Sequence, residues 1–326
     1  EKKMKKVLAL VLCLVLALSC TAMAEEKPLK VALILTGVAN DMGWNQAAYE
    51  GLELLEKEYG CEVAYTENCT TADMAAALTD YAAAGYDIVF GHSYEFGDPM
   101  CEVAEMYPDT YFVSIEGDQG NGENVASYQL KCQESAYVIG MLAARMTQAK
   151  NVGMVSAVQS ASMNKIVNGF LDGVAAVDSS VNTQVVYTGS YVDTALGKEC
   201  GLAVIENGAD FVYHCANDSG LGALNAAIEK GLWVCGDSYD QSSLSDEYVL
   251  TSAVYHVSKL IEKEYKDVTE GTFSGGVVEG GMADGVVVLT PFNKNVPEDV
   301  QDELNRVILQ IAAGELSIVA DPSVRN

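Results

Sequence analysis

One loop of the chain holds an acid, an indole and a carboxamide within five positions. Asp41, Trp44 and Asn45 follow the apolar segment 31–36, at the start of a helical pattern that extends to residue 59. In open α/β sheets, ligands bind at the carboxyl ends of strands, where such loops emerge. A carboxylate and an amide can bind the polar edge of a small molecule while the indole covers its apolar face. The loop therefore predicts a small-molecule site; helix capping by the acid or the amide, with the indole filling the core, is the alternative.

A second acidic segment follows the apolar stretch 233–237. The acids of Asp237-Ser238-Tyr239-Asp240 allow an alternative interpretation as the start of a calcium-binding loop. The glycine and glutamate that complete such a loop do not follow, so we interpret the segment as another strand-end loop. Helix capping by Asp237 is compatible with ligand binding, because both use strand-end loops.

The sequence lacks common catalytic motifs. It has three histidines, His92, His214 and His256, and no HExxH, GxSxG, Walker A or paired CxxC pattern. Gly220 and Gly222 lack the third glycine of a dinucleotide-binding loop. We therefore expect a binding protein without catalysis or cofactor, with His92 as a hydrogen-bonded residue of the pocket wall.

Short segments rich in Val and Ile alternate with helical periodicity from residue 30 onward, which is typical of βαβ units and a parallel sheet. The expected strands are 31–36, 62–67, 88–91, 111–115, 124–129, 152–157, 184–187, 211–214, 233–237, 249–254 and 286–289. The expected helices are 45–59, 72–84, 99–107, 133–147, 164–176, 195–207, 220–230, 257–272 and 297–313. The cycle restarts near residue 150, which predicts two α/β lobes.

We expect the chain to cross between the lobes near residues 149, 256 and 282, because its last elements begin a third, partial cycle. The first lobe would comprise residues 25–149 and 256–282, and the second residues 150–255 and 283–326. Several crossings form a hinge, and a hinge lets two lobes close on a ligand and bury it. The expected fold is thus two doubly wound α/β lobes joined by a three-segment hinge.

The first 24 residues have the composition of a secretory signal peptide. Basic residues precede the apolar segment 7–18, and Ala22-Met23-Ala24 has the small residues of a cleavage site. The apolar segment is too short to span a membrane. We expect export with cleavage after Ala24; lipid attachment at Cys20, which follows a small residue, is the alternative.

Without this segment, the chain has 15 basic and 45 acidic residues. Nucleic acid is excluded as a partner, since its binding depends on Lys and Arg that neutralise phosphates. The acids are dispersed through periodic segments, as on the solvated surface of a folded protein. Seven cysteines remain without regular spacing, so buried thiols are expected, with a Cys61–Cys69 disulfide as the alternative.

Several short motifs follow one another along the chain: DMGWNQ at 41–46, GHSYEFGDP at 91–99, ESAY at 134–137, GAD at 208–210 and GDSYDQ at 236–241. In order and spacing they resemble the basic membrane protein family, the purine-nucleoside-type substrate-binding components of ABC importers. The resemblance implies a type I periplasmic-binding-protein fold, no catalysis, and delivery of a purine base or nucleoside to ABC permease subunits at the membrane. We expect a monomer that is extracellular or attached to the cell surface.

The same resemblance implies a site built from both lobes. The acid and amide of the first loop would bind the edge of the base, its indole and an aromatic residue of segment 94–96 would stack on the faces, and acids and an amide elsewhere would complete the contacts. The implied residues are Asp41, Trp44, Asn45, Tyr94 or Phe96, and Glu116 in the first lobe, and Asn217, Asp218 and Asp237 in the second.

Tyr255 occupies the position at which nucleoside-binding members of the family usually have a lysine. This departure favours a free base over a nucleoside and makes Tyr255 a further candidate for ligand contact. A surface protein that senses a small molecule of another class, or an exported enzyme, is the alternative function.

Overall fold

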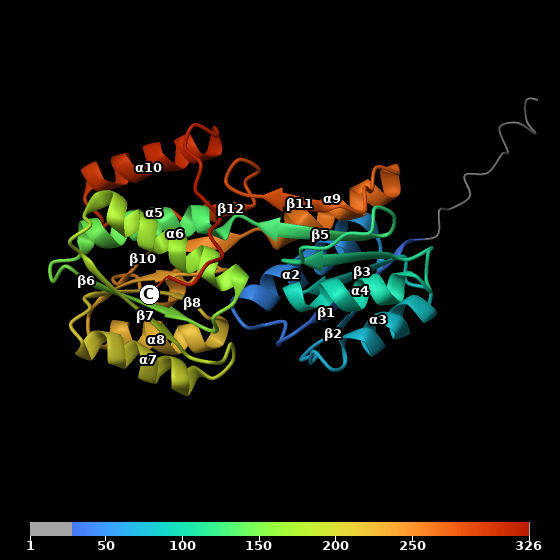
Figure 1. The fold of residues 1–326 in the computed structure, drawn as a ribbon, viewed down its shortest axis with the longest axis horizontal. Coiled ribbons are helices and arrows are strands. Elements are labelled where there is room, and N and C mark those ends of the chain that lie inside the picture. Colours follow the sequence, from blue (N-terminus) through green and yellow to red (C-terminus); the bar gives the residue numbers. More distant parts are fainter. Residues whose placement is uncertain (1–27, 326) are drawn as a thin grey trace, which may run out of the picture.

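The computed structural model describes residues 28–325, and it consists of two α/β lobes side by side (Figure 1). The segment predicted to be a signal peptide, which includes Cys20, lies outside these residues. The first lobe has a parallel six-stranded sheet of order β11-β5-β4-β3-β1-β2. Its strands are β1 (Lys30–Leu35), β2 (Glu62–Thr66), β3 (Ile88–His92), β4 (Tyr111–Ile115), β5 (Val125–Leu130) and β11 (Val277–Gly280).

Helices cover both faces of this sheet. They are α2 (Trp44–Tyr59), α3 (Met74–Ala83), the 3₁₀ turn η1 (Tyr94–Phe96), α4 (Gly97–Ala104) and α9 (Val257–Glu270). Along β1, Leu33 packs in the core beneath α2 and α9, whereas Ile34 packs in the core beneath α3 and α4. Burial on both faces explains why β1 is apolar at every position after Lys30.

The second lobe has a six-stranded sheet of order β12-β10-β9-β8-β6-β7, parallel except for the antiparallel β12. Its strands are β6 (Asn151–Ser156), β7 (Asn182–Tyr187), β8 (Phe211–Cys215), β9 (Trp233–Gly236), β10 (Val249–Tyr255) and β12 (Val287–Leu289). Its helices are α5 (Cys132–Met146), α6 (Ala161–Val177), α7 (Thr194–Glu206), α8 (Asn217–Glu229), the 3₁₀ turn η2 (Ser242–Leu244) and α10 (Glu298–Ala312).

The helix α5 lies in the second lobe, whereas the sequence analysis assigns it to the first. It packs closely against α6 through glycines: a Cβ at Gly173 would lie 1.9 Å from the Tyr137 carbonyl oxygen, and one at Gly140 would lie 2.2 Å from that of Phe170. The first crossing therefore lies near residue 131, between β5 and α5, and not near 149.

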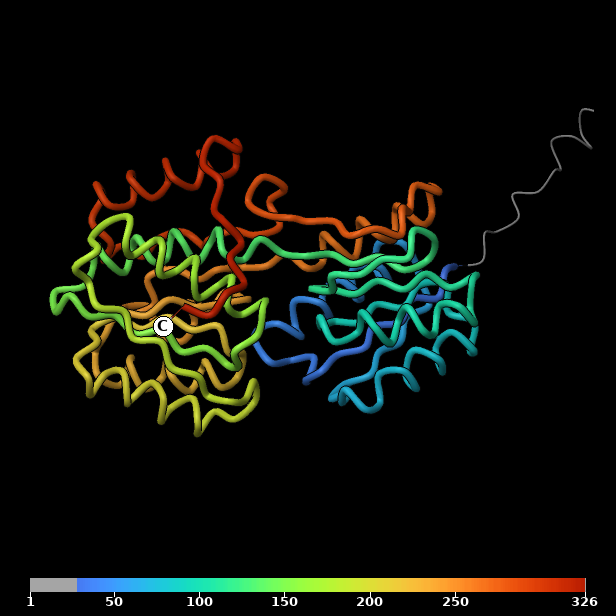
Figure 2. Tube along the Cα trace, viewed as in Figure 1, coloured from blue at the N-terminus to red at the C-terminus, as the bar shows by residue number. Residues whose placement is uncertain are grey.

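The other two crossings lie between β10 and α9 and between β11 and β12. Gly280 of β11 is paired with Leu130 of β5, and Val287 of β12 with Tyr255 of β10. All three connections thus lie together at one side of the junction between the lobes, as the chain trace in Figure 2 shows.

The seven cysteines of the described residues are free thiols, and five of them are buried. Cys61 and Cys69, the pair considered for a disulfide, belong to different apolar clusters of the first lobe. Among residues 28–325 no helix has the length and apolar character needed to cross a membrane.

Candidate functional site

A cavity of about 280 Å³ lies between the lobes, just below the range of about 300–1,000 Å³ for small-molecule sites. It is lined by the residues at the carboxyl ends of strands in both sheets, the position expected for a ligand site in this fold. From the first lobe these include Thr36, Trp44, Asn45, Ser93, Tyr94, Glu95 and Glu116; from the second, Ser162, Lys165, Tyr191, Asn217, Asp237, Ser238 and Tyr255.

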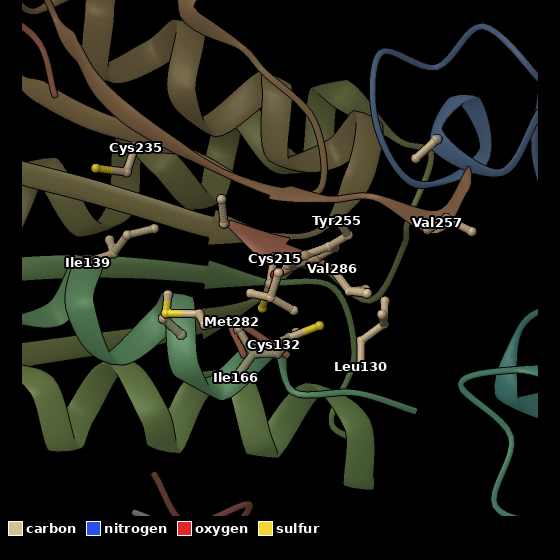
Figure 3. Packing of buried hydrophobic residues seen from close by; sticks show 14 of the residues in the cluster. Leu130, Cys132, Ile139, Ile166, Cys215, Cys235, Tyr255, Val257, Met282 and Val286 are labelled. Atoms are coloured by element: carbon tan, nitrogen blue, oxygen red, sulfur yellow. The ribbon is translucent and has the colours of Figure 1, made fainter. Parts of the chain in front are cut away.

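The apolar part of the wall is the edge of the hydrophobic core. Leu130, Cys132, Ile166, Cys215 and Tyr255 belong both to the largest core cluster and to the cavity lining. Figure 3 shows these side chains gathered where β5, α5, α6, β8 and β10 meet. The cavity therefore has an apolar side formed by core residues and a polar side formed by groups on the strand-end loops.

Trp44 has one face covered by protein. Its indole stacks on His92, with ring centroids 4.0 Å apart and planes 18° from parallel. The imidazole is buried, which lowers the pKa of His92 to about 3, and its Nε2 donates to the Trp44 carbonyl oxygen at 2.8 Å. Neutral His92 thus holds the indole in place, and the other face of Trp44 is the one available to a ligand in the cavity.

Asp41 caps α2 and does not line the cavity. Its carboxylate accepts the backbone N–H groups of Gly43, Asn45 and Gln46 at 2.9–3.0 Å and the Asn45 side-chain amide at 2.8 Å. The first N–H groups of a helix have no partners within the helix, and a carboxylate satisfies them. The capping alternative therefore describes Asp41.

Asn45 does line the cavity, but its amide is used within the loop. Its Oδ1 accepts the N–H of Gly37 at 3.2 Å, while its Nδ2 donates to Asp41. A Cβ on Gly37 would lie 2.6 Å from that nitrogen, so a glycine is required where the loop turns against the amide. Asn45 thus fixes the shape of the cavity wall.

The turn η1 separates Tyr94 from Phe96. Tyr94 lines the cavity and is 46% exposed, whereas Phe96 is fully buried against Gly91 and Met100 in the core beneath α4. The structure therefore brings Tyr94, and not Phe96, to the site. On the second lobe Tyr191 lines the same cavity, and burial raises the pKa of its hydroxyl.

Glu116 follows β4 in a left-handed conformation, with φ of 70°. Its Oε1 accepts the N–H of Leu130 at 2.6 Å, a contact that ties it to the first crossing between the lobes. Burial raises the pKa of Glu116 to about 7, and the positive charge of Lys165 opposes this rise. The carboxyl therefore changes charge near neutral pH.

Asp237 is held by three hydroxyl groups. Tyr213 and Tyr255 donate to its Oδ1 at 2.7 and 2.8 Å, and Ser238 donates to its Oδ2 at 2.9 Å. Burial raises the pKa of Asp237, and the hydroxyl donors counteract this by stabilising the carboxylate. Tyr255 lines the cavity with its hydroxyl already bound to Asp237.

Asn217 and Asp218 begin α8 but differ in position. Asn217 has φ of 46° and lines the cavity. Asp218 is not part of the lining; burial raises its pKa, and the charge of Asp41 on the other lobe raises it further. The structure thus assembles Trp44, Asn45, Tyr94, Glu116, Asn217, Asp237 and Tyr255 around one cavity and leaves out Asp41, Phe96 and Asp218.

Sequence reasoning missed Lys165 and Tyr191. Both follow strands of the second lobe, Lys165 in the first turns of α6 after β6 and Tyr191 in the loop after β7. The rule that ligands bind at carboxyl ends of strands could have identified these loops. The Nζ of Lys165 donates to Oε1 of Gln129, in the first lobe, at 3.4 Å.

The lobes also touch outside the cavity. The Tyr239 hydroxyl, in the loop after β9, donates to Oε1 of Glu50 at 2.8 Å and accepts from Nε2 of Gln46 at 3.1 Å. Both partners are on α2. One side chain of the second lobe is therefore bound to two consecutive turns of a first-lobe helix.

Two parallel-sheet lobes, three connections and a cavity at the facing strand ends define the class of two-lobed solute-binding proteins. The family model of PnrA-like ABC transporter substrate-binding proteins, Bmp, matches residues 29–321, and the chain belongs to this family. The predicted family and fold class are confirmed.

The known relatives are distant in sequence but cover most of the chain. A purine-binding protein of Brucella abortus is 28% identical over 92% of this chain and 85% of its own length. The ABC transporter nucleoside-binding protein BmpA of Lactococcus lactis is 27% identical, over 92% of each chain. A putative ABC transporter glucose-binding protein of Haloferax volcanii is 25% identical over 91% of this chain and 75% of its length.

A crystal structure of an ABC transporter solute-binding protein from Aeropyrum pernix shares the fold. Its TM-score is 0.82 at 22% identity, and the match covers 90% of this chain and 94% of that one. This structure shows the fold, and the family match makes the protein a substrate-binding protein of the ABC transporter class.

Proposed function

We propose that the protein captures a purine base or nucleoside between its lobes and delivers it to an ABC permease at the membrane. The observation that carries this proposal is Trp44, an indole fixed on one side by His92 and directed into a cavity of small-molecule size. A flat heteroaromatic ring gains from offset stacking on such a surface, by about 0.5–1.5 kcal/mol beyond area burial. Tyr94 and Tyr191 supply further aromatic surface from each lobe.

A free base is favoured over a nucleoside. The carboxylate of Asp237 could bind ribose hydroxyls, but it already accepts three hydroxyl hydrogen bonds. Tyr255 stands where a lysine would otherwise add a charged donor, and its hydroxyl is one of those three. We therefore expect free bases to bind at least as well as their nucleosides.

Export to the cell surface, with or without a lipid on Cys20, accords with the signal-like segment at residues 1–24 and with delivery to a permease. We expect a monomer with one ligand, no cofactor and no turnover. Sensing of a small molecule for a surface receptor would use the same cavity.

A thermal-shift screen of purine bases, nucleosides, sugars and amino acids tests the proposal. A ligand that binds only the folded state stabilises it by about 2.7 kcal/mol at a hundredfold excess over Kd. We expect purines to raise Tm and sugars to leave it unchanged. Stabilisation by glucose or by amino acids, without an effect of purines, would overturn the proposal.

A further inference from the structure

Several polar groups that line the cavity already have protein partners. Asp237 accepts three hydroxyls, and the Asn45 amide is bound to Gly37 and Asp41. Oε1 of Glu95 accepts from Thr71, and its Oε2 accepts from Ser93. These groups shape the wall, but they have little remaining capacity to recognise the edge of a ligand.

Lys165 differs from them. It is the one basic side chain in the lining, among the acids Glu95, Glu116 and Asp237. Within residues 28–325 no carboxylate lies within ion-pair distance of its Nζ, which donates one hydrogen bond, to Gln129 at 3.4 Å. An ammonium has three N–H donors, so about two remain free. Because the side chain is partly buried, an acceptor on the ligand would replace water that the cavity excludes.

Glu116 faces this ammonium from the first lobe. The charge of Lys165 acts on its carboxyl, whose Oε2 accepts no hydrogen bond from the described part of the chain. A ligand between the lobes thus meets a donor from α6 in the second lobe and a carboxyl from the loop after β4 in the first.

We propose that Lys165 makes the site selective for 6-oxopurines, such as hypoxanthine and guanine, over adenine. The inference rests on the proposed function and specifies which purines the site prefers. An ammonium only donates hydrogen bonds. In guanine both O6 and N7 are acceptors, and lysine pairs with them, whereas adenine has a donating amine at position 6. Adenine keeps the N7 acceptor, but its amine would lie against the ammonium as a second donor, and the hydrogen bond to O6 would be lost.

Calorimetric titration of the purified protein with hypoxanthine, guanine and adenine, and with their nucleosides, tests the inference. The wild-type protein should bind hypoxanthine at least tenfold more tightly than adenine. Lys165→Met should weaken hypoxanthine binding at least tenfold and change adenine binding less than threefold. Lys165→Arg, which keeps the donors, should keep the preference. The control is Lys198→Met, because Lys198 lies on α7 and is paired with Glu229 outside the cavity.

The inference is overturned if the wild-type protein prefers adenine. It is also overturned if Lys165→Met loses affinity for hypoxanthine and for adenine equally, because Lys165 then makes no distinction between them. The equal loss would indicate a structural role for the side chain. Absence of binding of all three bases and of their nucleosides to the wild-type protein would instead overturn the proposed function itself. The two failures are therefore distinguishable in one set of titrations.

Discussion

At the scale of single residues, the stacked pair of Trp44 and His92 is the most testable feature. Trp44→Ala should weaken ligand binding by about 2 kcal/mol or more, about thirtyfold, as expected for a buried aromatic anchor. The free energy of unfolding should fall by less than this, because the indole is only partly buried when no ligand is bound. Calorimetry and thermal unfolding of the same variant measure both quantities.

Trp233 provides the control, since it is the one other tryptophan and packs near Tyr248 in the second lobe. Trp233→Phe should bind normally, and its remaining emission, from Trp44, should shift on ligand binding. If Trp44→Ala binds normally but melts much earlier, the indole fills the core and does not contact a ligand.

The raised pKa of Glu116 predicts that the free energy of unfolding depends on pH. Its pKa is about 7 in the folded protein against an ordinary value of 4.5, so the folded state binds more protons between these values. Stability is therefore lost as pH rises from about 4.5 to about 7, by up to about 3 kcal/mol at 1.36 kcal/mol per pH unit. Glu116→Gln can still accept the Leu130 N–H and should be more stable than wild type at pH 8, with little difference at pH 4.5.

Thermal unfolding at both pH values measures this effect, with Glu95→Gln as the matched control at a partly exposed position of the cavity. An equal change in Tm at both pH values would mean that the charge of Glu116 is not the cause.

Residue type and loop position predicted several of the loops that line the cavity, but not the direction of each side chain. Trp44, Asn45 and Asp237 lie at strand ends where the sequence places them. Phe96 enters the core because the 3₁₀ turn directs it to the opposite side from Tyr94. The Asp41 carboxylate accepts hydrogen bonds from the first N–H groups of α2 and therefore does not line the cavity. These outcomes depend on local geometry that composition does not specify.

At the scale of elements, glycines set the packing of α5 on α6. Gly173→Ala would bring a methyl group against the Tyr137 carbonyl, and the helices must separate to admit it. Overpacking of this kind costs about 1–3 kcal/mol of the free energy of unfolding. Urea denaturation measures the loss. Gly97→Ala is the control, because its new methyl group would lie 3.5 Å from the Gln119 side chain, an ordinary contact, and should cost little. If Gly173→Ala costs equally little, α5 and α6 adjust freely to the added methyl group.

The same helix pair explains the misplaced domain boundary. Periodicity identifies residues 133–147 as a helix, and the observed α5 (Cys132–Met146) agrees closely. Periodicity carries no information on which lobe a helix packs against. Gly140 and Gly173 determine that through close contacts between residues far apart in the sequence.

At the scale of the whole molecule, the lobes are joined by three covalent connections on one side and by the Tyr239 contact with α2. A hydrogen bond between the lobes stabilises only the arrangement in which the lobes are closed. The apparent affinity of a ligand that binds the closed state depends on the fraction of molecules in that state. Tyr239 should therefore affect ligand binding although it does not line the cavity.

Tyr239→Phe should weaken ligand binding about two- to tenfold, because each hydrogen bond contributes about 0.5–1.5 kcal/mol. The loss should appear mainly as faster ligand release, since the bond forms when the lobes meet and must break before they open. Stopped-flow fluorescence of Trp44 in the Trp233→Phe background measures the release rate. Tyr248→Phe, which alters a tyrosine within the second lobe, is the control. An unchanged release rate in Tyr239→Phe would mean that ligand contacts alone hold the lobes together, and that the bonds to Glu50 and Gln46 contribute nothing to closure.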